Sequence, residues 1–232
     1  MKKLVIFDLD GTLLDTTLDI NNCLNVALSE HNLPTLNVEQ TLKNMGFGAK
    51  RLVELSCGDI ELELFEKVYK RYLYLLQNCT NELTYLYDGL DGVLKNLKKD
   101  GYMLAVVSNK PDEIVKDVCN QKLSEYNFDF VMGNNPELFK PKPDKSCLDY
   151  CLKQLNVLNS EAVYVGDSEV DVQTFLSADV DGIGVLWGFR DKKTLDDANC
   201  PRYANNALEL YAEIKKLWGK KWESFLMSSK NL

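Results

Sequence analysis

The sequence predicts an α/β fold in which a parallel sheet core carries an inserted helical cap. Two observations predict it. Along most of the chain, short apolar runs alternate with stretches of helical periodicity, which indicates strands joined by helical crossovers and therefore a parallel sheet. Residues 16–80 depart from this alternation, because they keep helical spacing and offer no strand. The 232 residues suffice for one large domain, or for a core with a smaller companion.

Each element of the core has its own signal. An apolar run over residues 4–7 stops at Asp8 and predicts a buried first strand. A helix over 90–97 is ended by two lysines and Gly101. Further strands are expected at 103–107, 128–132, 162–165 and 182–186, with helices around 114–119, 147–155, after 168 and around 210–217. Right-handed crossovers between such strands build a Rossmann-like parallel sheet.

The helical block falls between the first strand and all the others, so it is predicted to be an insertion. We expect a Rossmann-like core made of residues 1–14 and 86–232, and an α-helical cap made of residues 15–85. At the C-terminus, Trp218, Trp222 and Phe225 keep helical spacing, which predicts packing on the core or on a partner subunit. A monomer and a homodimer both remain open.

Charge and cysteine content exclude several classes of protein. A formal net charge of −8 and an isoelectric point near 4.8 exclude a nucleic-acid binder that works through a broad cationic face. The seven cysteines form no C-x-x-C pair, which is typical of a reducing compartment, so we expect a cytoplasmic protein. No apolar run approaches 18 residues, so no membrane partner is expected. The single histidine, His31, excludes zinc sites built on several histidines.

Polar clusters stand where four of the predicted strands end. They are residues 8–12, 108–111, 140–143 and 166–168, the last followed by Asp171. In open α/β sheets ligands bind beyond the carboxyl ends of the strands, so these clusters should meet at one edge. We therefore expect acids, a hydroxyl and a lysine to share one site.

The acids in these clusters indicate phosphate chemistry with a metal. Asp8 and Asp10 are two residues apart on an extended strand end, so their side chains face the same way, and their charges repel unless a cation relieves them. With Asp167 they form the hard oxygen set that suits Mg²⁺. Lys140 and Ser108 can hold the remaining phosphate oxygens. One carboxylate can then attack the phosphorus to form an aspartyl-phosphate, while the other protonates the leaving oxygen and activates water.

These clusters resemble the four motifs of the haloacid dehalogenase-like (HAD) phosphohydrolase superfamily. The motifs stand here as Asp8-Leu9-Asp10-Gly11-Thr12-Leu13, Ser108-Asn109, Lys140-Pro141-x-Pro143 and Gly166-Asp167-Ser168-x-x-Asp171. Further stretches, Gly184-Val185-x-Trp187-Gly188 among them, look like the phosphoglycolate phosphatase subfamily. The resemblance covers residues 3–217 and implies Mg²⁺-dependent hydrolysis of a small phosphorylated metabolite, with phosphoglycolate as the favoured substrate.

The resemblance also implies a role for each acid. Asp8 is the expected nucleophile and a Mg²⁺ ligand. Asp10 is the expected general acid and base, and its backbone carbonyl is a further ligand of the metal. Asp167 is the expected acidic metal ligand, with Asp171 supporting the metal site.

The resemblance also implies a second set of residues, which bind the phosphate. The expected substrate-binding residues are Ser108, Asn109, Lys140 and Gly11. Of these, Ser108 binds the transferring phosphoryl group, and Lys140 stabilises both that group and the nucleophile. Lys140 is preferred to Lys142 because the family's lysine directly precedes Pro-x-Pro.

Structural interpretations compete with these roles. The two acids of the first motif could form an ordinary solvated turn after a strand. Ser108 and Asn109, ahead of Pro111, could simply begin a helix. Ser168 and Asp171 match a capping box, a role that is compatible with supporting a metal site.

Three other functions compete with a phosphatase. A phosphosugar mutase of the β-phosphoglucomutase type usually has a histidine shortly after the first motif, and residues 16–20 contain none. A dehalogenase attacks carbon without a metal and has no need for Asp10. A phosphate-binding module that has lost turnover remains open, although every catalytic position is occupied. Two departures touch the subfamily alone: Gly89 lacks the preceding proline, and Asp179 stands where glycine is usual.

Overall fold

The computed structural model describes the backbone of residues 3–229 and the side chains up to residue 218, and its centre is a six-stranded parallel sheet. The strand order is β5-β4-β1-β6-β7-β8. The strands are β1 (Leu4–Phe7), β4 (Met103–Pro111), β5 (Phe130–Asn134), β6 (Ala162–Gly166), β7 (Asp181–Val185) and β8 (Tyr203–Ala204). Because β1 pairs with β4 on one side and β6 on the other, the first motif lies at the middle of the sheet.

Helices cover both faces of this sheet, as the uniformly apolar β1 requires. Alternate residues of β1 enter different cores: Val5 and Phe7 pack on one face, Leu4 and Ile6 on the other. The first face is covered by α5 (Leu90–Lys99), α6 (Asp112–Lys122) and α10 (Ala207–Ser229). The second is covered by α7 (Ser146–Leu155), α8 (Glu169–Ser177) and α9 (Lys192–Asp197). Two short 3-10 turns lie in connections: η1 (Ser124–Tyr126) follows α6, and η2 (Asn159–Glu161) precedes β6. The predicted α/β fold is confirmed.

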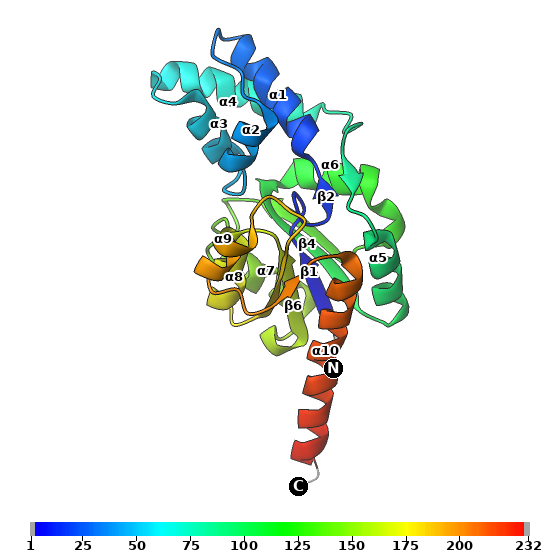
Figure 1. Cartoon of the computed structure of the whole chain (residues 1–232). Helices are drawn as coiled ribbons and strands as arrows, with labels where there is room; N and C mark the ends of the chain where they lie inside the picture. Colours follow the sequence, from blue (N-terminus) through cyan, green and yellow to red (C-terminus); the bar gives the residue numbers. More distant parts are fainter. Residues whose placement is uncertain (1–2, 230–232) are drawn as a thin grey trace.

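A helical insertion follows β1 and lies at one end of the sheet (Figure 1). It consists of α1 (Thr17–Ser29), α2 (Val38–Asn44), α3 (Ala49–Cys57) and α4 (Leu62–Gln77), which pack against one another. The chain enters and leaves it through two short antiparallel strands, β2 (Leu14–Asp15) and β3 (Tyr85–Leu86). The helical character of residues 16–80 is confirmed, whereas the division into two domains at residues 15 and 85 stays a prediction.

The structure departs from the expected elements at strand ends, and it contains α9 and β8, which were not expected. β4 continues in extended form through Ser108 to Pro111, because it regains pairing with β5 at Asn134 after a register shift. At the other end of the chain, Trp218 is buried and stacks edge-on against Tyr102, with ring centroids 6.1 Å apart. The side chains of Trp222 and Phe225 lie outside the described part.

The cysteines and the helices bear on the expected surroundings of the protein. All seven cysteines are free thiols. Among the described residues, none of the helices is both long enough and apolar enough to cross a bilayer.

Candidate active site

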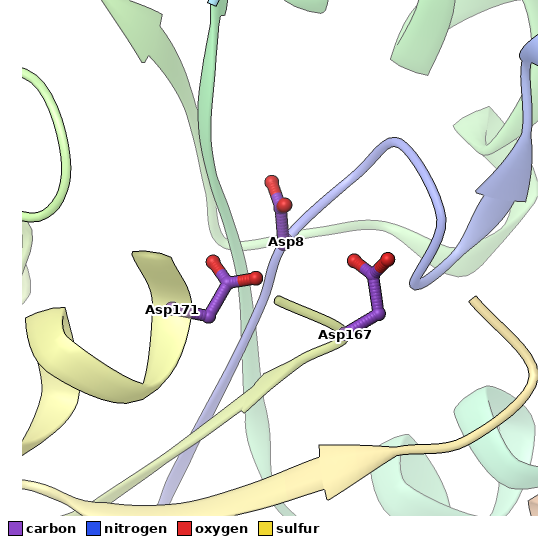
Figure 2. A group of neighbouring side chains, drawn as sticks. All are labelled: Asp8, Asp167 and Asp171. Atoms are coloured by element: carbon purple, nitrogen blue, oxygen red, sulfur yellow. The ribbon is translucent and has the colours of Figure 1, made fainter. Parts of the chain in front are cut away.

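Three aspartates from three elements converge at the carboxyl edge of the sheet (Figure 2). Asp8 directly follows β1, Asp167 follows β6, and Asp171 projects from the first turn of α8. All three are buried or nearly so, and one carboxylate oxygen of each lies within 4.8 Å of the others. Three acids this close favour a bound cation, since like charges out of water destabilise one another.

Asp8 stands at the centre of the group and is held through one oxygen. Its Oδ1 accepts a hydrogen bond from the Leu9 backbone N–H at 2.7 Å and lies 3.0 Å from the Lys142 ammonium. Burial, the largest cause, raises the pKa of Asp8 to about 7, and the Lys142 charge opposes that rise. The carboxyl therefore loses its proton near neutral pH.

Asp171 and Lys142 form a fully buried pair behind Asp8. The Lys142 Nζ donates to Asp171 Oδ1 at 2.7 Å and to the Tyr164 hydroxyl at 2.9 Å. Burial disfavours the Lys142 ammonium, but Asp171 and Asp8 outweigh that effect and raise its pKa. Asp171 Oδ2 accepts from the Ser168 N–H and hydroxyl, which confirms the predicted capping box at the start of α8.

Asp167 is the third acid and is fixed by the loops that follow β1 and β7. Its Oδ1 accepts from the Thr12 hydroxyl at 3.0 Å, and its Oδ2 accepts from the Phe189 N–H at 2.7 Å. Burial above all, then the charges of Asp171 and Asp8, raise the pKa of Asp167 well above its usual range. Hard carboxylate oxygens that are costly to ionise without a cation are the donor set that fits Mg²⁺.

The structure corrects the choice between the two lysines. Lys142 contacts Asp8, and its side chain is 2% exposed. Lys140 is exposed on the outer side of the same loop, so the preference for Lys140 as the lysine beside the nucleophile was wrong. The physical reason is that Asn109 fixes the backbone of this loop: its side chain accepts a hydrogen bond from the Lys142 N–H at 2.8 Å and donates one to the Lys142 carbonyl at 3.0 Å.

These two hydrogen bonds give Asn109 a role that differs from the expected binding of substrate. Asn109 lines the pocket, but its amide oxygen and nitrogen are both engaged by the Lys142 backbone. Asn109 therefore positions the lysine. The interpretation of Ser108 and Asn109 as a helix start is wrong as well, because α6 begins only at Asp112 and has no side-chain cap.

Ser108 and Asp10 lie on the open side of Asp8 and line the pocket, as the strand-end argument expected. The Asp10 carboxylate is outside the group of three acids. It accepts from the Thr16 hydroxyl at 2.7 Å and pairs with the Lys110 ammonium at 3.0 and 3.1 Å. Lys110 had no expected role, although it directly follows the serine and asparagine of the second motif.

Gly11 lies against Asp167 and Phe189 and is not one of the residues that line the pocket. Its φ is +85°, and a Cβ there would stand 2.4 Å from Asp167 Oδ2. Glycine is thus required so that the loop after β1 can turn and approach Asp167. The expectation that Gly11 binds substrate is replaced by this packing role.

The pocket in front of Asp8 is enclosed by the core on one side and by α1–α4 on the other. Its volume is about 50 Å³. The core contributes polar groups, whereas the insertion contributes an apolar wall formed by Ile20, Met45, Ala49, Leu52 and Leu76. A small pocket with this division suits a phosphate at the polar end and a short organic group at the other.

Arg190, in the loop after β7, joins the core to the insertion. Its Nε donates to Glu169 at 3.0 Å, while its two terminal nitrogens donate to the carbonyls of Leu42 at 3.1 Å and Met45 at 2.6 Å. Met45 begins the loop that runs into α3 and lines the pocket. Arg190 therefore holds the pocket's roof against the core.

Comparison with known proteins agrees with this geometry. Residues 5–185 match the family described as haloacid dehalogenase-like hydrolase. A phosphoglycolate phosphatase of Colwellia psychrerythraea is 31% identical over 195 residues, which cover 81% of this chain and 86% of that protein. Another, of Aliivibrio fischeri, is 28% identical over 203 residues, covering 84% and 89%.

A solved structure from Lactobacillus delbrueckii subsp. bulgaricus, named as a candidate phosphoglycolate phosphatase, superposes with a TM-score of 0.84. It is 30% identical to this chain, of which 92% is covered, as is 99% of the solved chain. The family match spans more than half of the chain and includes both motifs that supply the clustered acids. The chain belongs to the haloacid dehalogenase-like hydrolase family.

Proposed function

We propose that this protein is a Mg²⁺-dependent phosphomonoester hydrolase of small metabolites that works through an aspartyl-phosphate. The observation that carries the proposal is Asp8, a buried carboxylate that faces a small pocket and touches a buried lysine on its other side. Asp8, Asp167 and the backbone carbonyl of Asp10 would hold Mg²⁺. When bound, the metal would neutralise the acids and attract the phosphate dianion.

In the first step the Asp8 carboxylate attacks the phosphorus. Its Oδ1 is held by Leu9 and Lys142, so Oδ2 is the proposed nucleophile. The bond from phosphorus to the leaving oxygen breaks as the bond to Asp8 forms. Asp10, which lines the pocket beside Asp8, gives its proton to the leaving oxygen, and Ser108 donates a hydrogen bond to the transferred group.

In the second step water replaces Asp8 on the phosphorus. Asp10 takes a proton from that water and so returns to its starting state for the next substrate. The P–O bond to Asp8 breaks and inorganic phosphate is released. Lys142 stays paired with Asp171 and Asp8 throughout, so it stabilises the Asp8 carboxylate when that group leaves.

The proposed substrate is a short phosphorylated acid, 2-phosphoglycolate first. The names of the relatives support it, and so does a pocket of about 50 Å³ with an apolar roof. We propose that α1–α4 act as a cap that closes over the substrate and excludes water. Seven free thiols suit a reducing compartment, so we place the enzyme in the cytoplasm.

The deciding experiment is phosphate release from 2-phosphoglycolate, β-glucose-1-phosphate, pyrophosphate and an aryl phosphate, with Mg²⁺ and with a chelator. Asp8→Asn is compared with the wild type in every lane. We expect release that needs both Mg²⁺ and Asp8, with 2-phosphoglycolate preferred. Conversion of β-glucose-1-phosphate to glucose-6-phosphate without release would identify a mutase, and binding without any turnover would identify a binding module.

A further inference from the structure

Lys110 is a buried, charged residue that has no role in the two steps proposed above. Lys110 follows Ser108 and Asn109 at the end of β4 and is 7% exposed. Its ammonium lies 3.0 and 3.1 Å from the two oxygens of Asp10. The pair with Asp10 compensates the burial of this charge and engages two of the three N–H donors of the ammonium.

Lys110 lies in a pocket that holds few charged side chains. Lys110 is the sole lysine or arginine among the described residues that line the pocket in front of Asp8. The opposite wall is apolar, with Ile20, Met45 and Leu52 facing the core. Asp8 and Asp10 also line the pocket, so Lys110 carries the one positive charge there that can offset a further carboxylate, and that attraction is stronger beside an apolar wall than in water.

The position of Asp10 fixes which part of the substrate meets that charge. Asp10 is the proposed donor to the leaving oxygen, so the leaving oxygen must come within hydrogen-bond distance of it. The Lys110 ammonium contacts the same carboxylate. An atom group one carbon beyond the leaving oxygen therefore comes within reach of Lys110. An ammonium has three N–H donors and can bridge Asp10 and a second carboxylate.

We propose that Lys110 is a specificity residue that binds a carboxylate carried on the carbon next to the leaving oxygen. It makes the enzyme selective for short phosphomonoesters with a second negative charge. The inference rests on the proposed phosphatase function and deepens it, because it assigns recognition of the leaving group to one side chain. The pocket is small, so we expect short leaving groups to be preferred to long ones.

The test compares two esters of the same shape. In isobutyl phosphate a dimethyl-substituted carbon replaces the carboxylate of 2-phosphoglycolate, so the pair differs in charge at nearly constant size. We expect the wild type to favour 2-phosphoglycolate by about 10- to 100-fold in kcat/KM, the size of one hydrogen bond to a charged group. In Lys110→Met that ratio should fall toward one, mainly through a higher KM for 2-phosphoglycolate. Lys110→Arg should restore part of it.

Lys140→Met is the matched control, because it removes a lysine that is exposed outside the pocket and should leave the ratio unchanged. Equal losses on both esters in Lys110→Met would mean that Lys110 acts on Asp10 alone, and would overturn the inference. So would a wild type that turns over both esters equally, a result that needs no variant to fold. A wild type that releases phosphate from neither ester, nor from an aryl phosphate, would contradict the phosphatase function itself.

Discussion

Replacing Lys142 with methionine is expected to cost more stability than a change at most other lysines of the chain. The substitution keeps the length of the side chain but removes the charge that lies 2.7 Å from Asp171 and 3.0 Å from Asp8. Both acids are then buried beside one another without a cation. Removing one partner of a buried ion pair typically costs about 3–5 kcal/mol in the free energy of unfolding.

For a chain of this size that loss lowers the midpoint of thermal unfolding by about 6–20 °C. The assay is urea unfolding at pH 8 without divalent metal, followed by tryptophan fluorescence, since Trp187 bonds the Thr12 carbonyl beside the site. The loss should shrink at pH 5, where protonation of Asp8, whose pKa is raised to about 7, relieves the repulsion between the two acids. Adding Asp171→Asn to the variant should recover part of the loss for the same reason.

Lys140→Met is again the control, because Lys140 is exposed two residues away, and such a change normally shifts the unfolding free energy by at most about 0.5 kcal/mol. The reasoning would be refuted if Lys142→Met cost less than about 1 kcal/mol, the scale of an exposed ion pair. It would also be refuted if both variants lost the same amount. Either result would mean that the charge of Lys142 contributes no more to the free energy of unfolding than the charge of an exposed lysine.

Three further predictions follow from the same site. The pKa of Asp8 is raised from 3.8 to about 7, so between these pH values the folded protein keeps a proton that the unfolded chain releases. Without metal, the free energy of unfolding should therefore fall as pH rises from 4 to 7. Asp8→Asn should flatten the profile of urea midpoint against pH across that window. Arg190→Ala removes the bonds to the pocket's roof, so KM should rise and trypsin should cut α1–α4 faster, whereas Arg71→Ala, which breaks a pair inside the insertion, should leave KM unchanged. Gly11→Ala places a methyl group 2.4 Å from Asp167 in a strained backbone, so it should cost about 1–3 kcal/mol and weaken the stabilisation by added Mg²⁺; Gly92→Ala, in open space, should cost nothing.

The fold and the acids could be predicted from the sequence because both follow from local patterns. Apolar runs and helical spacing report burial directly, so the strand at 4–7 and the helices within 16–80 appear where they were expected. Asp8 and Asp167 each follow a parallel strand directly, and neighbouring parallel strands bring their carboxyl ends together whatever the loops do. The convergence of these two acids therefore needed no contact information.

The lysine could not be predicted in the same way. Lys140-Pro141-Lys142-Pro143 repeats one dipeptide, so two registers of the loop offer equivalent residues to the site. The register is decided by the Asn109 amide, which bonds the Lys142 backbone across 33 residues of sequence. The pair between Lys110 and Asp10 spans 100 residues and is equally invisible to a local pattern. Long-range side-chain contacts of this kind determine which of several suitable residues is used.

The two strands that connect the insertion to the core, β2 and β3, allow the insertion to be exchanged as a unit during evolution. Leu14 pairs with Leu86 and Asp15 with Tyr85, so the chain leaves and returns at adjacent points, about 5 Å apart as in any antiparallel ribbon. A segment whose ends touch can be replaced by another with touching ends while the sheet on either side keeps its register. Recombination at this ribbon could thus exchange the substrate-facing helices without disturbing the acids at β1 and β6. New specificities are then accessible through one replacement rather than many substitutions.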